Sequence, residues 1–342
     1  MNEFKGFHRG VDLGGWLSQS SYEKNHIETF ITEDDIELIK SWGADHVRLP
    51  FDFNIILDEN GAVRADGFAY LDRCVEWCMK RDMNIVLDLH KTMGFSFDKG
   101  ERETGFFDSE EYQNIFVNMW MEIAKHYSSL EERVAFELLN EITDMQFAQP
   151  WNAIARRTVE AIRKAAPANY ILIGGIFNNS IFGLTLLDKP YDDRIVYNFH
   201  YYNPLIFTHQ KAYWIDNMPA DFEISYPDSA EKYYSKASGI LDAGLVEPYK
   251  TFPGEIIDIN FMEWEFKQAV EISQKYGVPL YCGEYGVIDC APAEDTIRWH
   301  EDIHSLFELY GIGRAMWNYR GKDFGITDEK RKAVAKYLTE LL

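Results

Sequence analysis

The sequence predicts an α/β fold and, within that class, a closed (β/α)8 barrel of the TIM type. Two patterns carry this prediction: short apolar runs recur along the 342 residues, and each run is followed by a longer stretch with helical periodicity. Strands that alternate with helices pair in parallel through right-handed crossovers. Because there are eight such runs and no glycine-rich phosphate turn follows the first, a barrel is favoured over an open, doubly wound sheet.

The predicted strands are apolar runs of four to seven residues, the length typical of a buried strand. The fourth run is unusual because it ends in an amide and a carboxylate, in the segment FELLNE. In chain order the strands are predicted at 10–14, 46–49, 84–90, 134–140, 170–174, 195–200, 278–283 and 314–318.

Helical patterns with recognisable ends fill the intervals between the strands. Thr32 is a candidate N-cap for the segment TEDDIELIKSWG, with Asp35 at the capping-box position and Gly43 just past the end. These helices supply the crossovers that parallel strands need. Further helices are predicted at 108–127, 151–166, 258–276, 293–310 and 329–342.

One domain is expected for residues 1–342, because α/β barrels of this size with insertions form single domains. The stretch from about 201 to 257 is too long for an ordinary loop and is rich in Tyr, Pro and Asp. We interpret it as an insertion of loop and short helices after the sixth strand, over the active face. Its acidic and aromatic part, at 213–249, either closes one end of a cleft and enforces cleavage from chain ends, or extends the binding surface.

Composition restricts the class of ligand. The 56 acidic residues against 34 basic ones give a net charge of −22, which repels nucleic acid and anionic lipid. Aromatic residues make up 15% of the chain, and their amphipathic rings suit sugar faces. No segment reaches the roughly 18 apolar residues of a membrane span. We therefore expect a neutral or cationic ligand, with the aromatic content favouring a carbohydrate, no nucleic-acid or membrane partner, and a monomeric protein.

The four cysteines do not form a disulfide pattern. Cys74 and Cys78 lie one turn apart in a helical segment, and Cys282 and Cys290 flank another element. Free thiols favour a reducing compartment. The first residues, MNEFKGFHRG, lack the apolar core of a signal peptide. We expect either a cytoplasmic protein or a secreted one whose signal has been removed.

Polar and aromatic side chains follow six of the eight predicted strands, at the end where barrel enzymes have their active sites. Each residue alone has a structural explanation: Arg48 could pair with Asp45 or Asp52, and an isolated histidine or tryptophan is usually part of a core. Their shared position at one face is what indicates a catalytic site. These residues are Arg48, His90, Asn140, Glu141, His200, Tyr202, Glu284 and Trp317.

Glu141 and Glu284 follow the fourth and seventh predicted strands, which face one another across a barrel mouth. Two opposed carboxyl groups are what glycosidic bond cleavage requires: one is protonated and assists the departing oxygen, and the other attacks or activates water. A separation of about 5 to 5.5 Å gives retention of configuration, and about 6.5 to 9.5 Å gives inversion. Spacing in the sequence leaves both outcomes open.

Six motifs, in order, resemble those of glycoside hydrolase family 5, the cellulase family: HVRLPFD, VLDLH, FELLNE, YNFHYYNP, LYCGEYGV and AMWNY. The likeness is greatest to compact clostridial endo-β-1,4-glucanases with a helical insertion after the sixth strand, and it covers nearly the whole chain. The resemblance implies a retaining β-1,4-glucan hydrolase that acts on oligo- or polysaccharides. Since no phosphate loop, CxxC pair or basic patch is present, no cofactor is expected.

The resemblance assigns the two central roles. It implies that Glu141 is the acid/base, that Glu284 is the nucleophile, and that Arg48 keeps Glu284 ionised because a nearby cation lowers the pKa of a carboxylate. Glu141 must stay protonated near neutral pH. We therefore expect its pKa to be raised, by the overall negative charge and by the Glu284 carboxylate.

The resemblance also implies supporting roles. Asn140 would hydrogen-bond the 2-hydroxyl of the sugar, a contact that strengthens in the transition state. Tyr202 would donate a hydrogen bond to the nucleophile, while His90 and His200 would shape the point of cleavage. Trp317 would be the floor on which the sugar of the −1 subsite stacks through its apolar face.

The sequence departs from the family pattern after His90, where a second histidine and a Pro-Gly turn are common but KTMG stands here. Lys91 either meets a substrate hydroxyl or points outward. The polysaccharide therefore stays open among β-1,4-glucan, mannan, xyloglucan and lichenan, with action on short oligosaccharides from chain ends as a further alternative. A non-catalytic carbohydrate-binding barrel is the alternative from another class, although binding alone does not require the glutamate pair.

A competing motif is the segment HEDIH, in which His300, Glu301 and His304 match the HExxH pattern of zinc hydrolases. No third ligand follows at a recognisable spacing, and the segment belongs to the predicted outer helix after the seventh strand. Because an outer helix lies far from a barrel mouth, we expect an amphipathic surface helix without metal.

Overall fold

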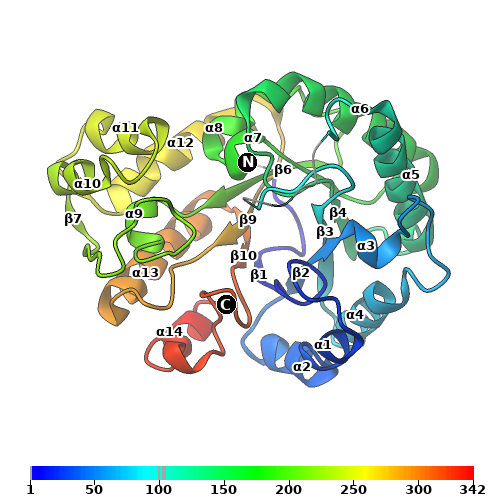
Figure 1. Ribbon diagram of the computed structural model, residues 1–342, viewed down its shortest axis with the longest axis horizontal. Helices are drawn as coiled ribbons and strands as arrows, with labels where there is room; N and C mark the ends of the chain where they lie inside the picture. Colours follow the sequence, from blue (N-terminus) through cyan, green and yellow to red (C-terminus); the bar gives the residue numbers. More distant parts are fainter. Residues whose placement is uncertain (1, 99–100, 102–104) are drawn as a thin grey trace.

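Eight parallel strands close into a barrel with helices around it, which confirms the predicted fold class (Figure 1). The computed structural model describes residues 2–98, 101 and 105–342. Around the barrel the strand order is β1-β10-β9-β6-β5-β4-β3-β2. The strands are β1 (Arg9–Asp12), β2 (His46–Asp52), β3 (Asn84–Lys91), β4 (Val134–Glu137), β5 (Ile171–Gly174), β6 (Ile195–Tyr201), β9 (Leu280–Tyr285) and β10 (Gly313–Met316).

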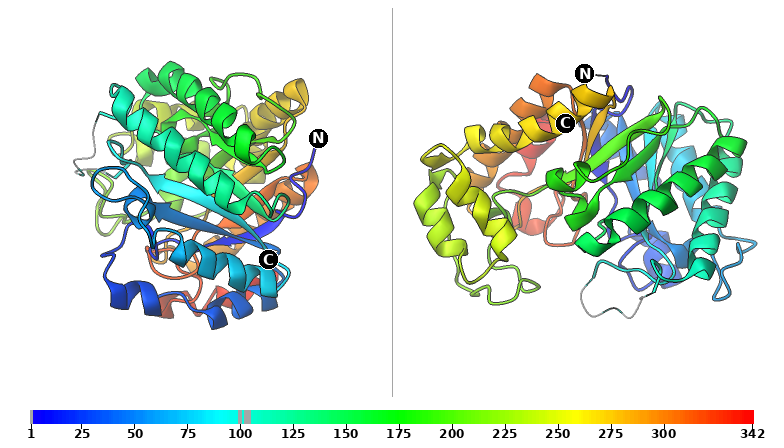
Figure 2. Two further views of the ribbon diagram at one scale, coloured as in Figure 1. Left: turned by 90° about the vertical axis from the view of Figure 1, so that its right-hand side faces the viewer. Right: turned by 90° about the horizontal axis from the view of Figure 1, so that it is seen from above.

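The helices lie outside the strands, and within the described residues none is long and apolar enough to cross a membrane. They cover the barrel on all sides in the two further views (Figure 2). Those outside the insertion are α1 (Lys24–Thr29), α2 (Glu33–Ser41), α3 (Phe53–Ile56), α4 (Ala69–Lys80), α5 (Glu110–Tyr127), α6 (Ala148–Ala165), α7 (Ile176–Asn179), α8 (Ile181–Leu184), α12 (Ile259–Tyr276), α13 (Ala293–Tyr310) and α14 (Ala335–Glu340), with 3-10 turns η1 (Met145–Phe147) and η2 (Glu329–Arg331).

Side-chain caps begin some of the helices, among them α2, α5 and α12. The carboxylate of Asp35 accepts from the backbone N–H of Thr32 at 2.8 Å, so the predicted capping box at the start of α2 is present. The single helix predicted at 329–342 is wrong: η2 and α14 share this stretch. Arg331 is buried and donates to the backbone carbonyl of Val287. This contact holds the first turn against the loop after β9 and interrupts the helix.

The barrel interior changes from apolar to polar along the strands. At its N-terminal end Phe4 and Phe7 stack with ring centroids 4.0 Å apart and pack on an apolar layer. Because side chains alternate with period two, two residues further along the strands the same face carries Asp88, Glu137 and Asn198, all buried. A polar layer therefore lies between the apolar plug and the barrel mouth. The apolar layer consists of Val86, Ala135, Leu172, Val196, Tyr281 and Ala315.

The insertion lies between β6 and α12. It holds α9 (Leu205–Thr208), α10 (Ala230–Ala237), α11 (Ala243–Thr251) and an antiparallel pair, β7 (Asp228–Ser229) with β8 (Ile256–Ile257). Figures 1 and 2 show α10 and α11 to one side of the barrel, next to α12. There Tyr249 of α11 contacts Phe261 of α12, with ring centroids 5.7 Å apart. The predicted position over the active face is therefore wrong for α10 and α11, and only the first part of the insertion adjoins the strand ends.

Candidate active site

The structure brings all eight predicted residues together at the carboxyl ends of the strands. Arg48 donates to Glu284 at 2.8 Å and to Asn140 at 2.9 Å. The hydroxyl of Tyr202 donates to the other oxygen of Glu284 at 3.0 Å. His200 lies 2.9 Å from Glu141. The remaining two residues, His90 and Trp317, stack on each other with ring centroids 5.8 Å apart and planes 7° from parallel.

The two predicted catalytic carboxyl groups face each other closely. One oxygen of Glu141, one oxygen of Glu284 and a ring nitrogen of His200 all lie within 4.8 Å of one another. This short spacing is closer to the carboxyl separation of retaining glycosidases, about 5 to 5.5 Å, than to the about 6.5 to 9.5 Å of inverting ones. By distance alone the same three groups could also ligate a divalent ion, since carboxylates and imidazole are zinc ligands.

Glu141 reaches the site because β4 continues in extended form beyond its last ladder residue. The sequence predicted a strand through Asn140, but the ladder with the neighbouring strands ends at Glu137. The segment stays extended since Leu138 donates to the Leu172 carbonyl at 3.1 Å and Asn140 donates to the Leu89 carbonyl at 3.0 Å. Glu141 then adopts a left-handed conformation with φ of 43°, which ends the extended segment at the acid.

Glu284 reaches the site through an irregularity in the sheet. It lies within β9, which extends to Tyr285 rather than ending at 283 as predicted. Since Tyr281 faces the interior, period-two alternation would place Gly283 inside and Glu284 outside. The register between β6 and β9 shifts between Phe199 and His200, and this shift returns Glu284 to the interior face.

Arg48 contacts four carboxylates at the centre of the site. It is fully buried, and its nitrogens lie 3.0 Å from Asp12, 3.0 Å from Asp88, 2.7 Å from Glu137 and 2.8 Å from Glu284. With Glu137 the contact is bidentate, through Nε and Nη2, the geometry that orients a guanidinium most firmly. The contact with Glu137 thereby fixes the orientation in which Arg48 donates to the Glu284 carboxyl.

The structural partners that the sequence suggested for Arg48 are wrong. Asp45 accepts from the His46 ring at 2.6 Å and from two backbone N–H groups. Asp52 accepts from the Tyr22 hydroxyl and from the backbone N–H of Gln19. The true partners of Arg48 are carboxylates of four other strands, Asp12, Asp88, Glu137 and Glu284.

Burial dominates the protonation of both glutamates. It raises the pKa of Glu141 to about 7, opposed by the hydrogen bond from Asn178 and the charge of Arg48. The predicted direction is correct, but its main cause is desolvation rather than neighbouring negative charge. Burial also raises the pKa of Glu284 to about 7, opposed by His200 and Arg48. The net rise of the Glu284 pKa is opposite to the lowering that was predicted from Arg48, because burial outweighs the charge of Arg48.

Asn140 has one amide group that the protein leaves unused. Its Oδ1 accepts from Arg48 at 2.9 Å, which fixes the orientation of the amide. Its Nδ2 is buried and has no hydrogen-bond partner among the described residues. A buried donor without a partner costs free energy unless a ligand accepts from it, so Nδ2 is available for a substrate hydroxyl.

Trp317 forms an apolar floor at the end of β10. It is 7% exposed and lies parallel to the His90 ring. The loop after β1 approaches this floor closely: a Cβ on Gly14 would lie 2.3 Å from Cη2 of Trp317, so glycine is required there. His90 is held by a hydrogen bond of 2.6 Å between its Nδ1 and Asp88. Burial lowers the His90 pKa well below its ordinary value, so the ring is neutral.

The expectation that Lys91 points outward is wrong, and the alternative contact with a substrate hydroxyl stays a prediction. Lys91 belongs to β3 and is buried. Its Nζ lies 2.6 Å from Asp98 and 2.5 Å from Glu101. Its charge is therefore compensated within the protein.

The HEDIH histidines have structural partners on the inner face of α13. His300 Nδ1 donates to the Thr296 carbonyl at 2.8 Å, and burial lowers the His300 pKa to about 3. His304 hydrogen-bonds the Tyr285 hydroxyl at 2.9 Å, while Glu301 is exposed on the outside. His300 and His304 thus face the core, whereas Glu301 faces away from it. The histidine spacing is explained by the packing of α13 on the barrel.

Sequence reasoning missed five polar residues that support the site. Three are acids in the middle of apolar runs, in GVDLGG, VLDLH and AFELL. A buried acid needs a partner, so this pattern, combined with Arg48 in the neighbouring strand, was the signal that could have found them. The other two are asparagines on a loop, for which no signal in the sequence existed. The five are Asp12, Asp88, Glu137, Asn178 and Asn179.

The chain is similar to proteins of known family and structure. Residues 11–323 match the sequence model of a family described as cellulase, glycosyl hydrolase family 5. Similar proteins include endoglucanase C of Acetivibrio thermocellus, 42% identical with 98% of both chains covered. Another is cellodextrinase A of Ruminococcus flavefaciens, 42% identical over 92% of this chain and 86% of that protein. Among solved structures, endoglucanase Cel5A of Thermotoga maritima is 25% identical, with a TM-score of 0.78 and 100% of both chains covered.

Proposed function

This chain belongs to the cellulase family, glycosyl hydrolase family 5, and from that premise we propose that it hydrolyses β-1,4-glucosidic bonds within glucans with retention of configuration. The observation that carries the proposal is the approach of the Glu141 and Glu284 carboxyl groups, whose oxygens lie within 4.8 Å. That spacing suits a double displacement, in which a carboxylate attacks the sugar directly. The endoglucanase relative, similar over nearly the whole of both chains, supports the choice of β-glucan.

In the first step Glu284 is the nucleophile and Glu141 the acid. A Glu284 oxygen forms a bond to the anomeric carbon of the −1 sugar while the bond to the leaving oxygen breaks. Glu141 gives its proton to that oxygen, so the leaving sugar departs neutral. Burial favours the proton on Glu141, and the donors Arg48 and Tyr202 stabilise the anionic form of Glu284.

In the second step water replaces the enzyme on the sugar. Glu141, now ionised, takes a proton from water as the water oxygen bonds to the anomeric carbon. The bond from that carbon to Glu284 breaks, which restores the carboxylate and leaves the configuration as it was. Asn140 Nδ2, a buried donor with no partner in the part of the chain that the structure describes, is placed to bind the 2-hydroxyl in both steps.

The test is product analysis with three proteins: the wild type, Glu284→Gln and Glu265→Gln. The substrates are soluble β-1,4-glucan, lichenan, glucomannan, xyloglucan and defined cello-oligosaccharides, and proton NMR follows the first anomer released. Loss of the nucleophile should lower kcat/KM by about 1000-fold or more. Glu265 is an equally buried glutamate on α12, so Glu265→Gln controls for removing a buried charge and should keep most of the activity.

The outcomes separate the alternatives. Mixed oligomers with the β-anomer first, lost in Glu284→Gln alone, support the retaining endoglucanase. Inverted product at first release, or activity in Glu284→Gln near that of the wild type, contradicts the mechanism. Absence of cleavage by the wild type would favour a carbohydrate-binding barrel. Preference for glucomannan or xyloglucan would keep the mechanism and change the substrate.

A second candidate is cleavage of short, soluble cello-oligosaccharides. The cellodextrinase relative, 42% identical to this chain, favours it as strongly as the endoglucanase relative favours polymer cleavage. The two candidates share one site and one mechanism. They differ in how many sugar units of the glucan the cleft accommodates. The ratio of kcat/KM on cellopentaose to that on the polymer decides between them.

We also propose a monomer that binds neither nucleic acid nor membrane, on the support of its net charge of −22. Light scattering and a nucleic-acid shift assay test these statements. The location stays a prediction between the cytoplasm and secretion after removal of a signal. Three of its four free cysteines are buried, which is compatible with a reducing compartment.

A further inference from the structure

Three consecutive residues with left-handed backbone follow β5, in the turn labelled α7 in Figure 1. Phe177, Asn178 and Asn179 have φ of 54°, 54° and 53°. Residues with side chains rarely adopt this conformation, and Asn tolerates it better than Phe. A run of three persists only where the surrounding structure holds it, and strain of this kind gathers at functional sites.

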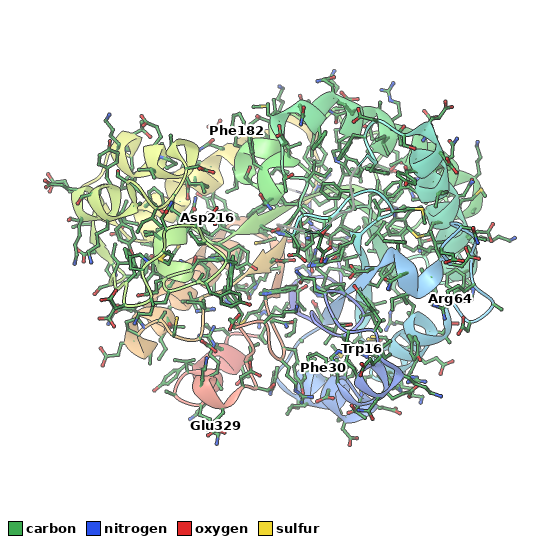
Figure 3. The ribbon with its side chains drawn as sticks, viewed as in Figure 1. Trp16, Phe30, Arg64, Phe182, Asp216 and Glu329 are labelled. Atoms are coloured by element: carbon green, nitrogen blue, oxygen red, sulfur yellow. The ribbon has the colours of Figure 1, made fainter. Side chains whose placement is uncertain are left out.

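Close backbone contacts hold this turn in place. The backbone N–H of Asn178 donates to the Ile142 carbonyl at 3.0 Å, next to Glu141. On the other side the turn packs on α8, where Figure 3 marks Phe182. A Cβ on Gly183 would lie 2.3 Å from the Ile176 carbonyl oxygen. The turn is thus wedged between α8 and the segment that carries the acid/base.

The two asparagine side chains point from this turn to the catalytic end of the barrel. Asn178 Nδ2 donates to Glu141 Oε2 at 3.1 Å. Asn179 Nδ2 donates to His200 Nε2 at 3.3 Å. Since Nε2 accepts, the proton of the neutral His200 ring is on Nδ1, which donates to Glu141 Oε1 at 2.9 Å. Both oxygens of the acid/base therefore receive donors that the turn supplies or orients.

We propose that the left-handed turn at 177–179 positions the acid/base: Asn178 fixes the Glu141 carboxyl directly, and Asn179 fixes it through the tautomer of His200. The inference rests on the proposed function, because it takes Glu141 as the acid/base. Proton transfer to the leaving oxygen needs a carboxyl held in one direction. Two donors on two oxygens supply that restraint.

The same contact tunes the acid. A donor to the charged form of a carboxyl lowers its pKa, and the hydrogen bond from Asn178 is the largest opposition to the effect of burial on the Glu141 pKa. Loss of the Asn178 amide should therefore raise the pKa of Glu141. The titratable and charged groups around Glu141 are Arg48 of β2, Asp88 of β3, Asp98, Glu137 of β4, His200 of β6, Tyr202 and Glu284 of β9.

Asn178→Gly is the decisive variant, because glycine keeps the left-handed backbone without strain and removes only the amide. A purely structural turn would accept this change. Asn217→Gly is the matched control: Asn217 also has positive φ, 62°, and is exposed on the insertion. Should Asn178→Gly not fold, Asn178→Asp keeps a residue that tolerates the conformation and replaces the donor with a carboxylate.

The readout compares leaving groups across a pH series. On cello-oligosaccharides, whose leaving sugar must be protonated, kcat/KM of Asn178→Gly should fall about 10- to 100-fold. The high-pH limb of its profile should move to higher pH, since the acid then keeps its proton longer. On 2,4-dinitrophenyl β-cellobioside, whose leaving group departs without a proton, kcat/KM should change less than about threefold. Asn178→Asp should move the limb in the same direction, and Asn217→Gly should leave both substrates and the limb unchanged.

Equal losses on both substrates with an unmoved high-pH limb would overturn the proposal and leave the turn a structural element. A loss in Asn217→Gly as large as in Asn178→Gly would do the same. If the wild type cleaves neither substrate, the proposed function itself fails and the positioning role falls with it. A selective loss on the cello-oligosaccharides, with the high-pH limb moved to higher pH, supports the positioning role of the turn.

Discussion

Asn140 carries a buried side-chain donor at the barrel mouth that has no hydrogen-bond partner among the described residues. Arg48 holds its Oδ1, so the amide cannot turn to satisfy Nδ2 elsewhere. In the proposed mechanism this donor bonds to the 2-hydroxyl of the substrate, which would offset the cost of burying it. The contact is expected to be strongest in the transition state, where the 2-hydroxyl carries more charge.

Asn140→Ala should lower kcat more than it raises KM. We expect kcat/KM on cello-oligosaccharides to fall about 10- to 100-fold, the equivalent of one hydrogen bond to a charged or partly charged group. Steady-state kinetics with the wild type measures the split. Asn152→Ala is the control, because Asn152 is a buried asparagine on α6 that donates to the Leu186 carbonyl. A rise in KM with unchanged kcat would contradict the transition-state role.

Single residues also mark the limit of prediction from sequence. Arg48, His200 and Glu284 were found because each is a polar residue near the end of an apolar run. Asn178 was not found, because its role depends on a left-handed turn that no residue pattern announces. Phe177 even argues against such a turn, since a bulky residue seldom has positive φ. Tertiary packing, rather than local preference, decides this conformation.

At the scale of elements, eight strands and their order along the chain followed from the alternation of apolar runs with helical stretches. Their ends did not follow so well: β4 stops at Glu137 and β9 continues to Tyr285. The register shift between β6 and β9 depends on two strands separated by the whole insertion. A pattern read along one strand contains no information about such a pairing.

The junction between α12 and β6 contains a carboxyl whose protonation affects stability. Glu265 of α12 accepts from the Tyr201 hydroxyl and from Asn203, both at 2.7 Å. Burial raises its pKa from 4.5 to about 7, against these two donors. The folded state therefore binds this proton more tightly than the unfolded chain. Its contribution to stability is present in full below about pH 4.5 and is lost as pH rises through about 7.

Glu265→Gln should remove this dependence, because glutamine mimics the protonated acid at every pH. The difference in free energy of unfolding, wild type minus variant, should decrease steadily from about pH 5 to about pH 8. Urea unfolding at several pH values measures it. Glu231→Gln, at an exposed position of α10, is the control for the substitution itself and is measured in the same series. Parallel curves for the wild type and Glu265→Gln would show that this carboxyl stays ionised.

At the scale of the whole molecule, the excess of acidic residues acts at a distance. A net charge of −22 repels anionic chains and leaves neutral ones unaffected. The effect should appear when two soluble forms of one polymer are compared, carboxymethyl cellulose and a neutral β-glucan. Both present the same backbone to the site.

KM for carboxymethyl cellulose should fall severalfold as salt rises from about 10 mM to about 200 mM, because screening shortens the range of the repulsion. KM for the neutral β-glucan should stay nearly constant over the same range. Initial-rate measurements on both polymers test this. Equal salt dependence on the two substrates would mean that salt acts on the protein and not on the encounter.

Arg48 has a consequence for how the barrel is divided. Three of its four acidic partners, Asp12, Asp88 and Glu137, come from the first four strands, and only Glu284 comes from the second half of the chain. The half-barrel from β1 to β4 thus contains Arg48 and three of its four acidic partners, and Glu284 joins them from 236 residues away. The two halves of the barrel can therefore vary separately. The second half can exchange its loops, including the 201–257 insertion, while the first half keeps the charged groups around the Glu284 carboxylate.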